Sequence, residues 1–187
     1  MWFAAAPDVA DVAAVLEFDR HAILGGQVWR LWTGHLVHYS AQHALIDLAT
    51  ALVAGLIAAQ SFGTRRVLCA LALGAPVISI GLLLTAPDCA LYRGASGLAV
   101  LLAVMAGAGL WQQARGNHVA MVRAALALLA VALAAKIAAE ARGFSLGGSD
   151  LPPDVMVAWQ AHLLGAVAGM AAVALLRARG RCARRTM

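Results

Sequence analysis

Long apolar stretches alternate with short polar connections along this chain, a pattern that predicts membrane-spanning helices. Five stretches reach the roughly 20 mostly apolar residues that a spanning helix needs. No segment shows the alternation of apolar and polar residues that is typical of a strand. We therefore expect an all-α, polytopic membrane helix bundle, with spans at residues 41–60, 67–86, 94–113, 119–139 and 157–177.

The amino-acid composition supports a membrane protein. Of the 187 residues, 63% are hydrophobic and 12% are charged, whereas about a quarter of the residues in a soluble domain are charged. A core of this size cannot enclose so much apolar surface in water. The composition therefore excludes an ordinary soluble globular protein and a disordered chain.

Arginine and acidic residues separate to opposite ends of the expected spans. Arg65, Arg66, Arg115 and the tail arginines fall at one end, and the acids other than Asp47 fall at the other. By the positive-inside rule, the arginine-rich end is cytoplasmic. We expect a single domain over residues 1–187, with an outward-facing segment at 1–40, five helices at 41–177 and a basic cytosolic tail at 178–187. The tail should contact lipid headgroups and not nucleic acid, because no aromatic residues separate its arginines.

Four polar residues lie inside the expected spans at nearly the same depth, below the outer surface. Ser96 falls at the start of the third span, and His162 lies roughly 7–8 Å into the fifth at 1.5 Å per residue. His43 and Asp47 fall in the outer half of the first span, and their spacing of four places them on one helix face. Polar groups are costly inside a bilayer, so all four are functional candidates.

These residue types are the ones that acyl transfer requires. A serine hydroxyl is a weak nucleophile until a base removes its proton, and an imidazole can do so near neutral pH. His43 and the backbone N–H groups around Ser96 could stabilise the developing oxyanion. Asp47 could donate a hydrogen bond only when protonated; alternatively, its carboxylate accepts the ring N–H of His43 and orients that ring. The three cysteines show no metal-ligand spacing, and we expect no metal and no organic cofactor.

Glycines accompany both Ser96 and His162. Ser96 lies between Gly94 and Gly97, where small neighbours allow a backbone or a substrate strand to approach. Gly165 and Gly169 follow His162 as a Gly-x-x-x-Gly stripe, which allows another helix to pack closely. The helix that carries Ser96 is the expected partner, because a Ser–His hydrogen bond needs the two backbones close together.

Three separated blocks of this sequence resemble the rhomboid family of intramembrane serine proteases. Residues 29–47 resemble the rhomboid Trp-Arg loop followed by a His-x4-His-x3-Asn helix. Residues 94–97, Gly-Ala-Ser-Gly, resemble its G-x-S-G nucleophile motif, and residues 161–169 resemble its A-H-x-x-G-x-x-x-G helix. The three blocks occur in the family's order and at matching expected depths.

The resemblance implies a role for each matching residue. Ser96 would be the nucleophile and His162 the general base, in a dyad without a third acid. His43 would help to bind the oxyanion, and Asp47 occupies the position where the family pattern has Asn. The resemblance also implies supporting roles: His38 would belong to the polar network, and Trp29 and Arg30 would belong to the membrane-embedded loop that shapes the site.

The amino-acid sequence of residues 29–38 and the short length of the chain are most similar to the rhombosortase branch of that family. This resemblance implies single-pass substrates: bacterial exported proteins with a C-terminal Gly-Gly motif, one hydrophobic helix and a basic end. The protease would lie in the bacterial inner membrane with its active site facing the periplasm. It would cut such anchors near the outer face, for release or for surface attachment.

The family pattern has six core helices, and the first precedes the Trp-Arg loop. Here residues 1–28 contain only a short apolar start at 1–6, so the usual first helix is missing or truncated. Either the protein functions with five helices, or sequence upstream of Met1 continues an apolar run preceded by basic residues.

Other interpretations stay open. The chain could be a catalytically inactive rhomboid that only binds membrane helices. His38, His43 and His162 could instead bind b-type haem through paired imidazoles, which a Soret band would reveal, although this leaves residues 94–97 unexplained. Two minor expectations are that Lys136 and Glu140 extend outward to the interface and that His35 is an interfacial polar residue. We also expect a water-accessible polar cavity that opens outward at the nucleophile.

Overall fold

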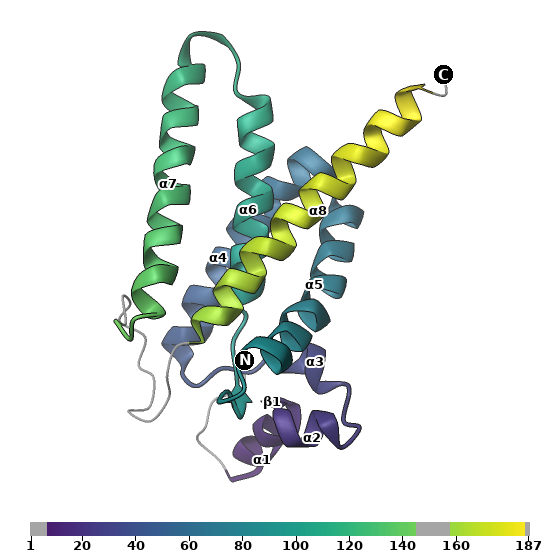
Figure 1. Ribbon diagram of the computed structural model, residues 1–187, viewed down its shortest axis with the longest axis vertical. Coiled ribbons are helices and arrows are strands. Elements are labelled where there is room, and N and C mark those ends of the chain that lie inside the picture. Colours follow the sequence, from purple (N-terminus) through teal and green to yellow (C-terminus); the bar gives the residue numbers. More distant parts are fainter. Residues whose placement is uncertain (1–6, 145–157, 186–187) are drawn as a thin grey trace.

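The computed structural model describes residues 7–144 and 158–185, which form a bundle of long helices with short elements at one end (Figure 1). Five helices in this part of the chain are long and apolar enough to cross a membrane. This confirms the all-α polytopic bundle expected from the apolar stretches. The long helices are α4 (Ala41–Phe62), α5 (Thr64–Thr85), α6 (Ser96–Gln113), α7 (Val119–Glu140) and α8 (Trp159–Arg185), with the one-turn helix η1 (Gly116–His118) before α7.

Short elements make up the described N-terminal part of the chain. They are α1 (Pro7–Leu16), β1 (Phe18–Asp19), α2 (Arg20–Leu24) and α3 (Arg30–Thr33). Figure 1 shows them gathered at one end of the bundle, whereas the C-terminus lies at the other end. The short apolar start at residues 1–6, where the usual first helix is expected to be missing or truncated, lies outside the described residues.

A two-stranded sheet joins the N-terminal part to the connection between α5 and α6. Strand β1 pairs antiparallel with β2 (Leu91–Tyr92), with Phe18 opposite Tyr92 and Asp19 opposite Leu91. The expectation of no strand was wrong, because two-residue strands are too short to show alternation. The pairing holds the segment that leads into Ser96 against the N-terminal part.

The Arg20 side chain caps the C-terminal end of α5. Its guanidinium donates to the carbonyls of Leu82, Leu83 and Ala86 at 2.7–3.1 Å, and its Nε donates to the Cys89 carbonyl at 3.3 Å. The last carbonyls of a helix have no partner within the helix, and a cation near the C-terminus also interacts favourably with the helix dipole. Arg20 thereby fixes the turn that follows α5.

Helix α5 continues through Pro76 without ending. Proline has no N–H, so the carbonyl of Ala72, four residues earlier, lacks its usual helical donor. The indole N–H of Trp32 in α3 donates to this carbonyl at 2.9 Å. The carbonyl that Pro76 leaves without a helical donor is therefore a docking point for α3.

Helix α6 lies at the centre of the bundle, in contact with both α4 and α8. It begins two residues later than expected, because Gly94 has a positive φ of 131° and forms the turn before it. At the other end of α6, the amide of Gln113 donates to the Ser61 hydroxyl at 2.7 Å, which ties α6 to α4. Buried side chains of α4, α5, α6 and α8 form a core between them: Ala54, Ala58, Phe62, Val67, Leu101, Leu102, Met105, Ala106 and Val173.

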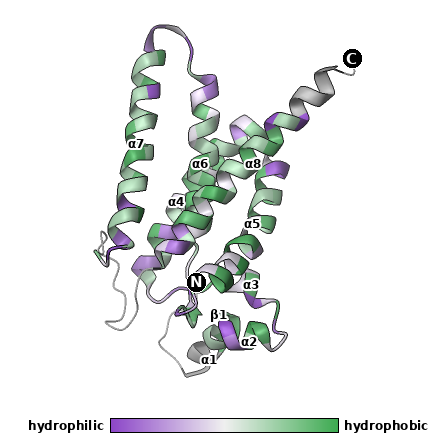
Figure 2. Ribbon diagram, viewed as in Figure 1, coloured by the Kyte–Doolittle hydropathy of each residue, from purple (hydrophilic) through white to green (hydrophobic). Residues whose placement is uncertain are grey.

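Helix α7 stands apart from the other long helices (Figure 1). None of the 18 residues of its most apolar stretch is buried, and Figure 2 shows apolar residues along its length, with polar ones at its ends. A helix that is apolar all round is suited to lipid contact. Only Ile137 and Glu140 of α7 are buried, and both lie near its C-terminal end.

Candidate active site

The segment before α6 is held in place from several directions. The Gly94 N–H donates to the Gly34 carbonyl at 3.1 Å, and the Tyr92 hydroxyl donates to the Gly94 carbonyl at 2.8 Å. The Ala95 N–H donates to Nε2 of His38 at 3.2 Å. Burial raises the pKa of the Tyr92 hydroxyl, so it remains a donor at neutral pH. Ser96 follows as the first residue of α6 and is half-buried.

The beginning of α4 and the segment just before it supply two imidazoles and a carboxylate. The Ser40 hydroxyl accepts the His43 N–H at 3.1 Å and caps the helix. Asp47 Oδ2 lies 3.3 Å from Nε2 of both His43 and His38, and the Asp47 side chain is 8% exposed. His43 Nδ1 is buried without a hydrogen-bond partner, whereas Asp47 Oδ2 faces the two imidazole nitrogens. The side chains of His38, His43 and Asp47 therefore form a polar cluster at the start of α4.

Gly94 brings this cluster against the serine segment. A Cβ at residue 94 would lie 2.9 Å from His43 Cε1 and 3.2 Å from Asp47 Oδ2, so only glycine fits. The ring of Tyr39 stacks on His43 with 3° between the planes. The imidazole of His43 thus lies between Tyr39 and Gly94, and Gly94 precedes Ser96 by two residues.

Helices α6 and α8 touch backbone to backbone beside Ser96 and His162. A Cβ at Gly97 would lie 2.9 Å from the Ala161 carbonyl, and one at Gly165 would overlap the Gly97 carbonyl. A Cβ at Gly169 would lie 2.7 Å from the Leu101 carbonyl. The structure therefore places the glycine stripe of α8 against α6, with the neighbours of the nucleophile and base candidates in contact.

His162 is buried, and its Nδ1 lies 2.7 Å from Glu140 Oε2. The other oxygen of Glu140 pairs with the ammonium group of Lys136, one turn earlier in α7. Within the described residues, no hydrogen bond joins Ser96 to His162. The helices position the side chains of Ser96 and His162, and the His162 imidazole forms a hydrogen bond with the Glu140 carboxylate.

Several expectations for individual residues need correction. Glu140 does not extend to the interface, because its side chain is 2% exposed and lies against His162. His35 is not interfacial: its Nε2 lies 3.1 Å from the Ala75 carbonyl and 3.1 Å from the Ser79 hydroxyl, and burial lowers its pKa. Sequence reasoning also missed Tyr92 and Ser79, because neither residue belongs to a recognisable motif.

Trp29 and Arg30 bind the N-terminal part and do not reach the polar cluster. The Arg30 guanidinium is buried and donates to the carbonyls of Ala14 and Glu17 at 2.8 Å. The Trp29 indole donates to the Val15 carbonyl at 3.3 Å, and 45% of the residue is exposed. Their contacts fix α1 against α3.

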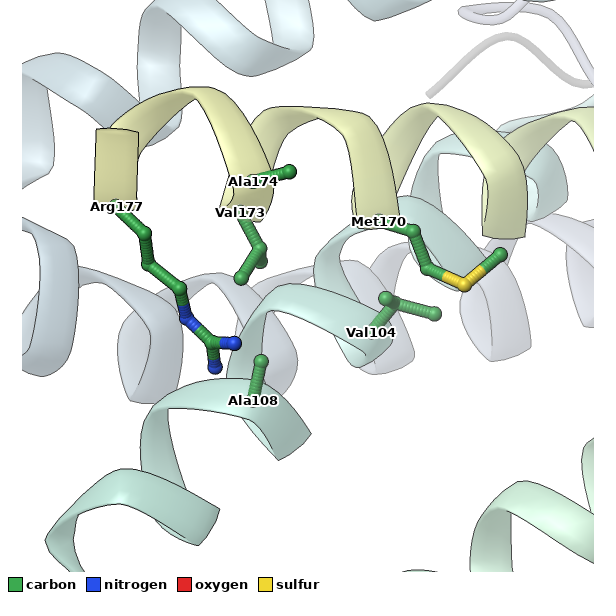
Figure 3. A pocket seen from close by; sticks show the side chains of 6 residues that line it. All are labelled: Val104, Ala108, Met170, Val173, Ala174 and Arg177. Atoms are coloured by element: carbon green, nitrogen blue, oxygen red, sulfur yellow. The ribbon is translucent and has the colours of Figure 1, made fainter. Parts of the chain in front are cut away.

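A hollow with a cavity volume of 270 Å³ lies between α6 and α8, farther along both helices than Ser96 and His162. Figure 3 shows its lining, which is apolar apart from the guanidinium of Arg177. Arg177 belongs to the arginine-rich end of the chain. This hollow is separate from the polar cluster, and the outward-opening cavity at Ser96 stays a prediction.

Comparisons with known proteins connect this arrangement to one family. Searches of curated proteins and of solved structures gave no match. A family model described as the Rhomboid domain matches residues 25–179, which include all of the polar cluster. The chain therefore belongs to the rhomboid family, whose members are intramembrane serine proteases, and it is a multi-pass membrane protein.

Proposed function

We propose that this chain is an intramembrane serine endopeptidase in which Ser96 is the nucleophile and His162 the general base. The observation that carries the proposal is the backbone contact of Gly97 with Ala161, which brings the first turn of α6 beside the His162 turn of α8. Family membership supplies the reaction class.

The proposed reaction proceeds by acyl transfer. Ser96 Oγ attacks the scissile carbonyl while Nε2 of His162 accepts its proton, and the imidazolium then protonates the leaving amine. A water molecule, activated by the same imidazole, hydrolyses the acyl-enzyme. His43 and the first N–H groups of α6, which lacks a side-chain cap, stabilise the oxyanion. Asp47 orients His43, since its carboxylate lies beside the ring.

The substrates we propose are single-pass anchors of exported proteins, cut near the outer face of the membrane. The resemblance of residues 29–38 to the rhombosortase branch supports a C-terminal Gly-Gly class. The placement of the polar cluster at the end opposite the arginine-rich loops supports an outward-facing site. The proposed setting is a bacterial inner membrane, with the site toward the periplasm, the C-terminus in the cytosol and residues 1–187 acting as one domain.

Co-expression with a candidate Gly-Gly-anchored protein tests the proposal. Wild type should release the substrate, whereas Ser96→Ala and His162→Ala should not. Ser61→Ala is a matched control, because it removes a serine hydroxyl at the opposite end of α4, where Ser61 bonds Gln113. Cleavage that persists in Ser96→Ala would refute the nucleophile assignment. Substrate capture without cleavage by wild type would favour a non-catalytic binder.

A further inference from the structure

A buried carboxylate on the otherwise lipid-facing helix α7 lies beside the base candidate. Glu140 is the last residue of α7, and its side chain is only 2% exposed. Burying a charged group is costly unless it is paired and hydrogen-bonded. In a helix with so few buried residues, this arrangement needs a specific explanation.

Both oxygens of the Glu140 carboxylate are engaged. Oε2 lies 2.7 Å from His162 Nδ1, and Oε1 pairs with the Lys136 ammonium. Lys136 is 41% exposed at its side chain, so its charge reaches solvent while its partner stays buried. The carboxylate is thus held at a fixed position and aimed at one nitrogen of the imidazole.

This geometry selects the tautomer of His162. An ionised carboxylate only accepts hydrogen bonds, so Nδ1 must carry the proton and Nε2 of the neutral ring keeps its lone pair. Nε2 is the nitrogen that must accept the serine proton in the proposed reaction. The negative charge also stabilises the imidazolium that forms during the reaction.

We propose that Glu140 is a positioning residue for His162, so that the site works as Ser96–His162–Glu140 with Lys136 fixing the carboxylate. This inference rests on the proposed function and replaces the expectation of a dyad without a third acid. Glu140 does not contact substrate; it acts through the imidazole. Helix α7 is therefore part of the catalytic apparatus, although it packs loosely on the bundle.

The electrostatic surroundings of His162 predict how variants shift the pH dependence. The charged groups that act on it are Glu140 and Lys136 from α7 and Asp47 from α4, which has His43 and His38 beside it. Removing the Glu140 charge disfavours the imidazolium, so activity should persist to lower pH. Removing the Lys136 charge strengthens the effect of the carboxylate, so activity should be lost at higher pH than in wild type.

Steady-state cleavage by purified full-length protein, measured across pH, tests these opposite shifts. Glu140→Gln should lower kcat by about 10²-fold or more with little change in KM and move the acidic limb of the profile to lower pH. Lys136→Met should move that limb to higher pH, and Glu140→Asp should recover part of the kcat that Glu140→Gln loses. Glu17→Gln is the matched control: it breaks another buried ion pair, with Arg93, and should lower the melting temperature without moving the limb.

A spectroscopic measurement separates this inference from the proposed function. In protein labelled with ¹⁵N-histidine, the His162 signals, identified by their loss in His162→Ala, should show the Nδ1–H tautomer in wild type and a changed pattern in Glu140→Gln. An Nε2–H tautomer in wild type, or kcat and an acidic limb unchanged in Glu140→Gln, would overturn the role of Glu140. An Nδ1–H tautomer in a protein that neither cleaves nor reacts with a fluorophosphonate would instead refute the proposed function.

Discussion

A methyl group added at Gly165 should separate the two helices that carry Ser96 and His162. A Cβ at this position would overlap the Gly97 carbonyl oxygen and lie 2.9 Å from its carbon and 3.2 Å from Cα of Gly97. All three atoms are backbone, so no side chain can rotate away. Since ordinary contact begins at 3.4 Å, relieving the carbon contact alone requires a shift of about 0.5 Å, and the oxygen requires more.

This displacement should reduce both activity and stability in Gly165→Ala. A misplacement of about 1 Å in a catalytic group costs on the order of 10²-fold in rate, so we expect a fall of about 10- to 100-fold in kcat. Overpacking of a close contact costs about 1–3 kcal/mol, which is a fall of several degrees in melting temperature for a chain of this length.

Substrate cleavage and thermal unfolding in detergent measure the two effects. Gly107→Ala is the matched control in α6, because a Cβ there meets nothing within 4 Å, and alanine favours a helix over glycine. That variant should keep wild-type cleavage and melting temperature, or melt slightly higher. If Gly165→Ala behaved like Gly107→Ala, the close crossing of α6 and α8 would not position the site.

Three further predictions concern the surroundings of the site. Asp47→Asn, which restores the residue of the family pattern, should keep kcat within about tenfold of wild type. Asp47→Ala should have a kcat at least about tenfold below that of Asp47→Asn. Equal kcat values for the two variants would remove Asp47 from the oxyanion network. Trp32→Phe should lower the unfolding free energy by about 1 kcal/mol, because it removes the indole hydrogen bond to the Ala72 carbonyl. The loss should be smaller in a Pro76→Ala background, where the backbone N–H of residue 76 can donate to that carbonyl. A double-mutant cycle measures the difference between the two losses. Because burial lowers the pKa of His35, the folded state keeps it neutral while the unfolded state binds a proton below about pH 6.5; the melting temperature should therefore fall on acidification below that pH, and less steeply in His35→Gln.

The spanning helices could be predicted because their signal is local. Each stretch of about 20 apolar residues is a complete unit in lipid, where the backbone must satisfy its own hydrogen bonds. The polar residues inside these stretches, Ser96, His43, Asp47 and His162, stood out against that background. The glycines at 94, 97 and 165 indicated close approach, which the structure places between α4, the serine segment and α8.

The contacts of α7 could not be predicted, because its sequence has no polar stripe to mark the face that meets the bundle. Glu140 and His162 are 22 residues apart, and their meeting depends on how α7 is rotated about its axis. The spacing of Lys136 and Glu140 indicated only that they share a helix face. The β1–β2 pairing and the Arg20 cap depend in the same way on sequence-distant partners.

The central claim is that the Ser96 hydroxyl is activated by His162, and covalent labelling tests it most directly. Purified protein would react with a fluorophosphonate, and mass spectrometry would locate the adduct. The account predicts an adduct on Ser96 in wild type that is lost in Ser96→Ala and strongly reduced in His162→Ala. An adduct on another residue, or labelling of Ser96 that is equally fast without His162, would contradict it.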